Sequence, residues 1–191
     1  MSYQADGEGI TFAAAPVAAE TEITGPVAAR LFVSSSVTDA DLFCVLRVFA
    51  PDGQEVTFRG AIDPHTPLAQ GWLRLSHRKL DPVLTRPYHS HDEIQPVTPG
   101  EICQADVEIW PTSVILPTGY RLALTVRGRD HEVRYPDAPR LGSFKNEMTG
   151  CGPFLHNDPA DRPKELTTSR QTLWHGPGRE SYLLLPVIPA G

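Results

Sequence analysis

The residues best suited to chemistry in this 191-residue chain are two histidines in a polar segment flanked by prolines. His89 and His91 stand at alternate positions and are followed at once by Asp92 and Glu93. Alternate positions of a strand share one face, so the two imidazoles and a nearby carboxylate could hold a divalent metal ion. The acid, however, follows His91 too closely for a cupin-type ligand set, and no further histidine clearly completes one. We therefore favour a solvated loop cluster over a metal site, and expect no metal or other cofactor.

A second polar segment, His156 to Asp161, could form a calcium loop because it is rich in oxygen donors. A turn held by hydrogen bonds from side chains to backbone explains the same residues more simply. We therefore expect no calcium site here.

Signatures of catalysis are missing from the sequence. There is no G-x-S-x-G motif for a serine nucleophile and no glycine-rich phosphate loop. The three cysteines, Cys44, Cys103 and Cys151, are widely spaced, and the first two lie among apolar neighbours. This pattern indicates buried thiols in a reducing compartment rather than disulfides, although Cys151 lies in an expected loop and could be reactive. We expect no catalytic residue in this chain.

Charge and hydropathy limit the partners. With 17 basic and 23 acidic residues the net charge is -6, which argues against nucleic acid or an anionic membrane as a partner. No apolar run is long enough to span a bilayer, and residues 1–9 lack the features of a secretory leader. A cytoplasmic location is favoured.

The elements that must position any site are predicted to be strands. Apolar and polar residues alternate over 27–34, 101–109 and 120–127, whereas 42–49 is apolar on nearly both faces. We expect 27–34 to pair with 42–49, and 101–109 to pair with 120–127, as two hairpins. The 42–49 strand should lie in the middle of a sandwich, because both of its faces need cover.

Prolines and glycines punctuate the rest of the chain, with 19 and 15 residues respectively. Residues 77–99 and 128–169 are expected to form long surface excursions. We predict an all-β fold, a jelly-roll β-sandwich, with a frayed N-terminus over 1–9 and a single domain over 10–191.

Three tryptophans, Trp72, Trp110 and Trp174, flank the expected strands. Two interpretations remain open: they line a cleft or an interface, or they belong to the core.

Several short stretches carry a family resemblance, and they occur in this order: Thr21–Pro26 (TEITGP), Ala29–Ser36 (ARLFVSSS), Thr38–Leu42 (TDADL), Gly71–Lys79 (GWLRLSHRK), Ile109–Ser113 (IWPTS), Pro117–Leu122 (PTGYRL) and Ser181–Pro189 (SYLLLPVIP). Together they resemble the C-terminal domain of the CocE/NonD hydrolases, a family that includes cocaine esterase and the Xaa-Pro dipeptidyl-peptidases.

The resemblance implies a galactose-binding-like jelly roll attached to an α/β-hydrolase domain, in cis or in trans. In the family the catalytic Ser, Asp and His lie in that other domain, so no catalytic position transfers to this chain, which is either a fragment or a separately encoded piece. The implied function is to buttress the hydrolase domain, an esterase, acylase or dipeptidyl-peptidase, and to shape its substrate cleft. The alternative is a free-standing module that binds a carbohydrate or another ligand, and the sequence leaves homo-oligomerisation open.

Overall fold

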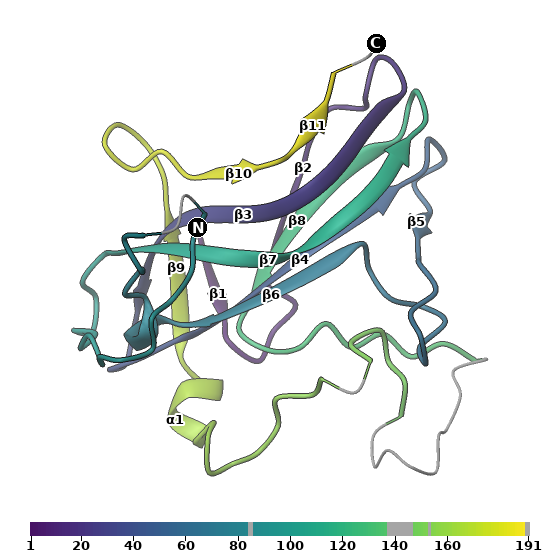
Figure 1. Cartoon of the computed structure of the whole chain (residues 1–191). Coiled ribbons are helices and arrows are strands. Elements are labelled where there is room, and N and C mark those ends of the chain that lie inside the picture. The colour runs from purple at the N-terminus through teal and green to yellow at the C-terminus, as the bar shows by residue number, and fades with distance from the viewer. Residues whose placement is uncertain (84–85, 137–146, 153, 190–191) are drawn as a thin grey trace.

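The computed structural model describes residues 1–83, 86–136, 147–152 and 154–189, and within them the fold is almost entirely β. Two sheets face each other (Figure 1), and helix is limited to a 3-10 turn, Leu75–His77, and α1, Lys164–Thr167. The strands of the described chain are β1 (Ser2–Gln4), β2 (Ile10–Ala13), β3 (Thr21–Ser35), β4 (Asp41–Phe49), β5 (Glu55–Val56), β6 (Ala69–Arg74), β7 (Cys103–Leu116), β8 (Arg121–Arg127), β9 (Arg170–Trp174), β10 (Tyr182–Leu184) and β11 (Val187–Ile188). The predicted all-β sandwich is confirmed.

Strand β3 organises the first sheet. It pairs with β7 along one edge, and with β9, β10 and β11 along the other, while β1 continues the sheet beyond β9. The register along β7 shifts between Gly25 and Val27, which is a bulge that lets this long strand bend around the core. The second sheet has the order β2, β8, β4, with β5 and β6 on the far side of β4.

The two predicted hairpins are wrong. Strands β3 and β4 lie in opposite sheets, and β8 pairs with β2 and β4 rather than with β7. Sequence neighbours thus face each other across the core instead of sharing a ladder, because each carries one apolar face that a facing sheet can bury. The prediction that 42–49 lies centrally is confirmed, since β4 is flanked by β8 and β6.

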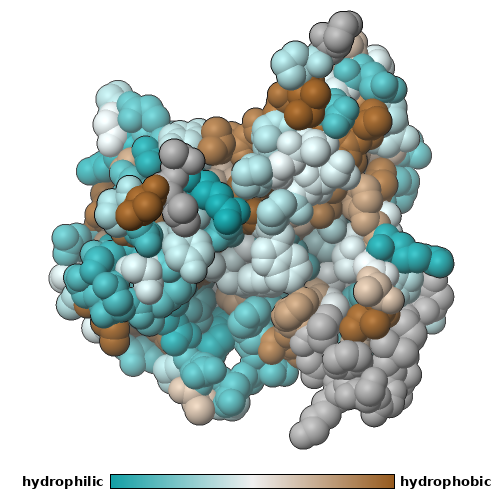
Figure 2. Space-filling view, viewed as in Figure 1, coloured by the Kyte–Doolittle hydropathy of each residue, from teal (hydrophilic) through white to brown (hydrophobic). Residues whose placement is uncertain are grey.

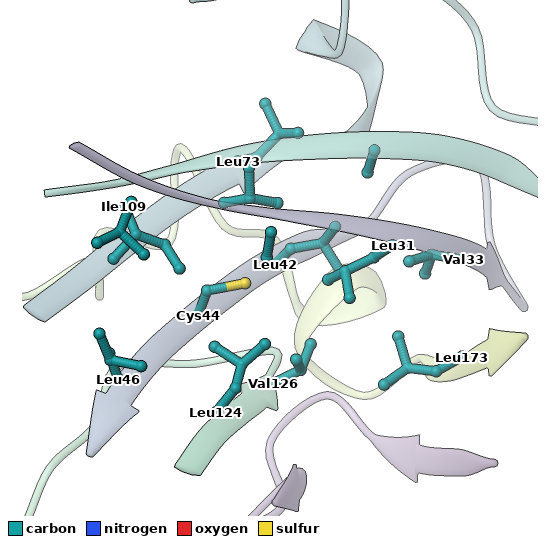
Figure 3. Packing of buried hydrophobic residues seen from close by; sticks show 14 of the residues in the cluster. Leu31, Val33, Leu42, Cys44, Leu46, Leu73, Ile109, Leu124, Val126 and Leu173 are labelled. Carbon is teal, nitrogen blue, oxygen red and sulfur yellow. The ribbon is translucent and has the colours of Figure 1, made fainter. Parts of the chain in front are cut away.

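Apolar side chains from both sheets interdigitate to form the core (Figure 3). Leu31 and Val33 project from β3 toward Leu42, Cys44 and Leu46 on β4, and all five are buried. Burying each large aliphatic side chain contributes about 1.5–3 kcal/mol. Burial also raises the pKa of the Cys44 thiol to about 12, so this cysteine is a core residue, as predicted.

The N-terminus differs from the prediction that residues 1–9 are frayed. Strand β1 pairs with β9, and the Met1 ammonium group donates a hydrogen bond to the Leu173 carbonyl oxygen at 2.8 Å. Tyr3 is buried, and its hydroxyl donates to Gln171 Oε1 at 2.6 Å. A short polar stretch is therefore ordered by one buried aromatic side chain and a strand partner that lies far away in sequence.

The sheets meet most closely where β6 runs beside β7 (Figure 1). A Cβ atom at Gly71 would lie only 2.1 Å from the Glu108 carbonyl oxygen, so only glycine permits this approach. The two predicted excursions flank this seam: Arg86 of the first reaches Glu108 on β7, and Arg162 of the second reaches Asp41 on β4. Within the described part of the chain, no helix has the length and apolar character needed to cross a bilayer.

Candidate functional site: an aromatic cleft at the seam between the sheets

A cavity of about 650 Å³ opens at the seam between β6 and β7, between the two excursions. We call it the aromatic cleft, because Phe43, Trp72, Tyr88, Trp110 and His156 contribute rings to its lining. Phe43 and Trp72 are opposite each other in the β4–β6 ladder, so they point to the same side of the second sheet. The cleft thus stands on rigid strands and is walled by loops.

Two of the three predicted tryptophans meet here. The rings of Trp72 and Trp110 pack edge to face, with centroids 4.9 Å apart and an interplanar angle of 80°. The ring centroids of Trp72 and His156 lie 5.1 Å apart, while residue Trp110 remains 44% exposed. Trp110 also packs edge to face against Phe154, with centroids 5.1 Å apart, so two neighbours fix its ring plane while part of its surface stays exposed.

Trp174 lies elsewhere. It ends β9, and its Nε1 donates to the Ser34 hydroxyl at 2.9 Å. It lines a separate, largely apolar groove of about 510 Å³ with Phe12 and Leu183, between β2 and the β9–β10 edge. Exposed apolar surface also gathers along β10 and β11 (Figure 2). The structure therefore does not join Trp174 to the other two tryptophans.

Asp41 holds the floor of the aromatic cleft together. Its carboxylate accepts hydrogen bonds from Arg74 Nε and Nη2 at 2.8 and 3.1 Å, and from Arg162 Nε at 2.8 Å. The hydrogen bond to Asp41 raises the pKa of Arg74, although partial burial opposes this. Arg162 further donates to the carbonyl oxygens of His156 and Gly128, and its guanidinium lies 5.1 Å from the Phe43 ring. One carboxylate thus ties β4, β6 and the second excursion into a single unit.

His156 is held as a wall of the cleft. Asp130, which is buried, accepts a hydrogen bond from the His156 backbone N–H at 2.7 Å and lies 2.9 Å from its Nδ1. These two contacts to one carboxylate fix the position of the imidazole ring. The segment predicted as a simple turn therefore also supplies one side chain of the cleft.

The two candidate metal ligands lie at the edge of the cleft. The rings of His89 and His91 have centroids 6.0 Å apart, and His91 adopts a positive φ of 51°, so the segment is not a regular strand. His91 Nδ1 lies 3.4 Å from His77 Nδ1. Among the residues that the structure describes, no three or more His, Cys, Asp or Glu side chains are grouped to hold a metal ion.

The expected solvated cluster is wrong for His89. This side chain is only 8% exposed, and its Nε2 has no hydrogen-bond partner among the described residues. Burial, with a smaller effect from His91, lowers the pKa of His89, so the ring is neutral near pH 7. The excursion folds back onto β7 and buries a histidine that polar residues, Ser90 to Glu93, follow in the sequence.

Sequence reasoning missed most of what builds the cleft, namely Asp41, Phe43, Asp130 and Arg162. Asp41 and Arg162 are separated by 121 positions, and no motif links them. The one available signal is that Asp41 directly precedes the apolar residues of β4, where a charged side chain that becomes buried needs a partner.

The fold and the site define an all-β sandwich domain with a cleft lined by aromatic rings at the seam between its sheets. Residues 2–184 match the family described as the X-Pro dipeptidyl-peptidase C-terminal non-catalytic domain, and the chain belongs to that family.

In the relatives the matching segment is part of a much longer chain. The chain is 27% identical over 169 residues to cocaine esterase of Rhodococcus sp. (strain MB1 Bresler), covering 87% of this chain and 23% of that enzyme. A Mycobacterium bovis protein, which its name places among serine esterases, is 29% identical over 154 residues, covering 75% of this chain and 23% of the relative. The chain therefore spans about a quarter of the length of these relatives.

Solved structures support the same fold. A CocE/NonD family hydrolase from Staphylococcus aureus superposes with a TM-score of 0.78 at 22% identity, covering 98% of this chain and 32% of the other. An α-amino acid ester hydrolase gives a TM-score of 0.60 at 17% identity, covering 95% and 26% respectively. The predicted family resemblance is confirmed: the chain belongs to the family of X-Pro dipeptidyl-peptidase C-terminal non-catalytic domains, and it shares its fold with about a third of a CocE/NonD family hydrolase.

Proposed function

We propose that this domain buttresses a hydrolase domain and that its aromatic cleft forms part of the wall of that enzyme's substrate cleft. The observation that carries the proposal is the pairing of Trp72 and Trp110 in a concave, ligand-sized site. Sites that bind small molecules are concave, largely apolar and equipped with a few fixed polar groups, as this one is.

Rigidity supports the same role. Asp41 and Asp130 immobilise the loop that carries His156, so the cleft is preformed rather than assembled on contact. A preformed wall loses little conformational entropy when a substrate or a neighbouring domain packs against it. The substrates of the relatives are esters and X-Pro peptides by name, and we extend that class to the whole protein in which this domain acts.

The test compares this chain alone with the same chain joined to its hydrolase portion, using an ester substrate and an X-Pro dipeptide amide. We expect no turnover above buffer for this chain alone and measurable turnover for the joined protein. Deletion of this domain should then lower both the thermal stability and kcat/KM of the joined protein. If the deletion left both unchanged, the buttress and the cleft wall would both be wrong.

A free-standing ligand-binding module remains the second candidate, because the aromatic cleft is complete within this chain. This candidate predicts saturable ligand binding by the chain without any effect on a hydrolase. Binding that persists while the deletion has no kinetic effect would favour it.

A further inference from the structure

The charges around the aromatic cleft select among ligand classes. Four carboxylates line it, from Asp41, Glu108, Asp158 and Asp161, against two guanidinium groups. Both guanidinium groups already bind Asp41, and Arg162 donates with all three of its nitrogens. The cleft therefore has little left to offer an anion, whereas its remaining carboxylates favour a cation.

Strand geometry places one of these carboxylates beside an aromatic face. Glu108 and Trp110 are two positions apart on β7, so they project from the same face at a spacing of about 7 Å. The Glu108 side chain is about one-third exposed, and the Trp110 ring is the most exposed aromatic surface of the Trp72–Trp110 pair. A two-carbon linker between an aryl ring and an ammonium group spans a comparable distance.

An unsatisfied buried acceptor provides an independent indication of a ligand. His89 lines the same cleft, is nine-tenths buried, and has an Nε2 atom without a hydrogen-bond partner among the described residues. A buried polar atom without a partner is unfavourable, and a ligand N–H donor would satisfy it.

We propose that the aromatic cleft binds a primary arylalkylammonium ligand, with its ring against Trp110 and its ammonium group directed to Glu108 and His89. For its biological setting the inference rests on the proposed function, since it names the substrate feature that the cleft would recognise. The attraction combines a carboxylate, a hydrogen-bond acceptor and the π faces of the tryptophans.

One neighbouring cation opposes this binding. Arg86 Nη1 lies 3.3 Å from Glu108 Oε1 in a largely exposed pair, and so competes with the ligand for the carboxylate. Removing this cation should tighten binding, whereas a purely structural role for Glu108 would predict no gain.

The experiment is an NMR titration of this chain, in which the three tryptophans give three indole N–H signals. The probes are phenethylammonium, its neutral analogue 2-phenylethanol and the anion 3-phenylpropanoate. We expect saturable shifts of the Trp72 and Trp110 signals with phenethylammonium, binding about tenfold weaker for the alcohol and weaker still for the anion. The Trp174 signal, from the opposite edge of the sandwich, should not move.

Three variants test which side chains determine the affinity for the ammonium ligand. Glu108→Gln should weaken phenethylammonium binding about three- to tenfold, and Arg86→Gln should tighten it by about threefold, while Trp174→Phe leaves it unchanged. Equal affinity for the amine and the alcohol, or an unmoved Trp110 signal, would overturn the proposal. No hydrolase takes part in this titration. A negative result would therefore overturn the ligand proposal alone, and the deletion experiment on the joined protein tests the proposed function separately.

Discussion

Replacing Asp41 by Asn tests the framework of the aromatic cleft most severely. The variant keeps the size of the side chain but removes the charge that holds Arg74 and Arg162. The side chains of Asp41 and Arg162 are each only 10% exposed, so the arginine would become a buried cation without a counter-ion. Breaking such a pair from one side typically costs about 3–5 kcal/mol, and retention of amide acceptor bonds brings the expectation to about 3 kcal/mol.

The assays are urea unfolding, which gives the free energy of unfolding, and thermal unfolding, which gives Tm, for wild type and variant at pH 7, both followed by far-ultraviolet circular dichroism. For a domain of this size, a loss of about 3 kcal/mol corresponds to a fall in Tm of roughly 6–12 °C. Lys79→Gln is the matched control, because Lys79 forms only exposed ion pairs with Asp92 and Glu93, and it should leave Tm unchanged. A loss below about 1 kcal/mol for Asp41→Asn would show that Asp41 does not hold the cleft together.

Three further predictions concern pH, packing and thiol reactivity. Burial, followed by the charge of Arg47, lowers the pKa of His131 to about 4, so the folded protein keeps this ring neutral while the unfolded chain takes up a proton below about pH 6.5. The free energy of unfolding should therefore fall as pH drops from 6.5 to 4, by up to about 3 kcal/mol from this group. His131→Asn should make the free energy of unfolding, measured by urea unfolding, depend less steeply on pH. An equal dependence on pH in wild type and variant would contradict the prediction. Gly71→Ala should destabilise the fold by roughly 2–4 kcal/mol through its clash with the Glu108 carbonyl. Gly53→Asn has open space around it and strains only the backbone at a φ of 86°, which Asn tolerates better than most residues, so it should cost less than about 1 kcal/mol by the same assay. Finally, a thiol reagent should modify no cysteine in the native chain and three after denaturation, because burial raises the pKa of each thiol; rapid native labelling of any one would refute its burial.

The fold class and the strand positions could be predicted because alternation of apolar residues reports directly on burial. Strand pairing could not, since the alternation along β3 shows which of its faces is buried but not which strands pair with its two edges. The ordered N-terminus was missed for a similar reason: Tyr3 gains its burial from β9, which lies at the other end of the chain.

The candidate site was predictable only in part. Aromatic size and flanking turns singled out Trp72 and Trp110, but the same signals also selected Trp174, which belongs to another groove. The ion pairs and hydrogen bonds that shape the cleft join segments that are distant in sequence, and neither Asp41 nor Arg162 belongs to a recognisable motif. Local sequence therefore indicates which side chains are available, while the packing of β6 against β7 and of the two excursions decides which of them meet.

The most direct test of the cleft's role is kcat/KM for an ester and an X-Pro substrate in the protein that joins this domain to its hydrolase portion. We expect Trp72→Leu combined with Trp110→Leu to lower kcat/KM about tenfold or more, mainly through KM, because the substrate loses a wall of its binding site. Trp174→Phe, measured beside it, should leave kcat/KM within about twofold of wild type. Unchanged kcat/KM in the double variant, with its fold intact by circular dichroism, would contradict a role for the aromatic cleft in substrate binding.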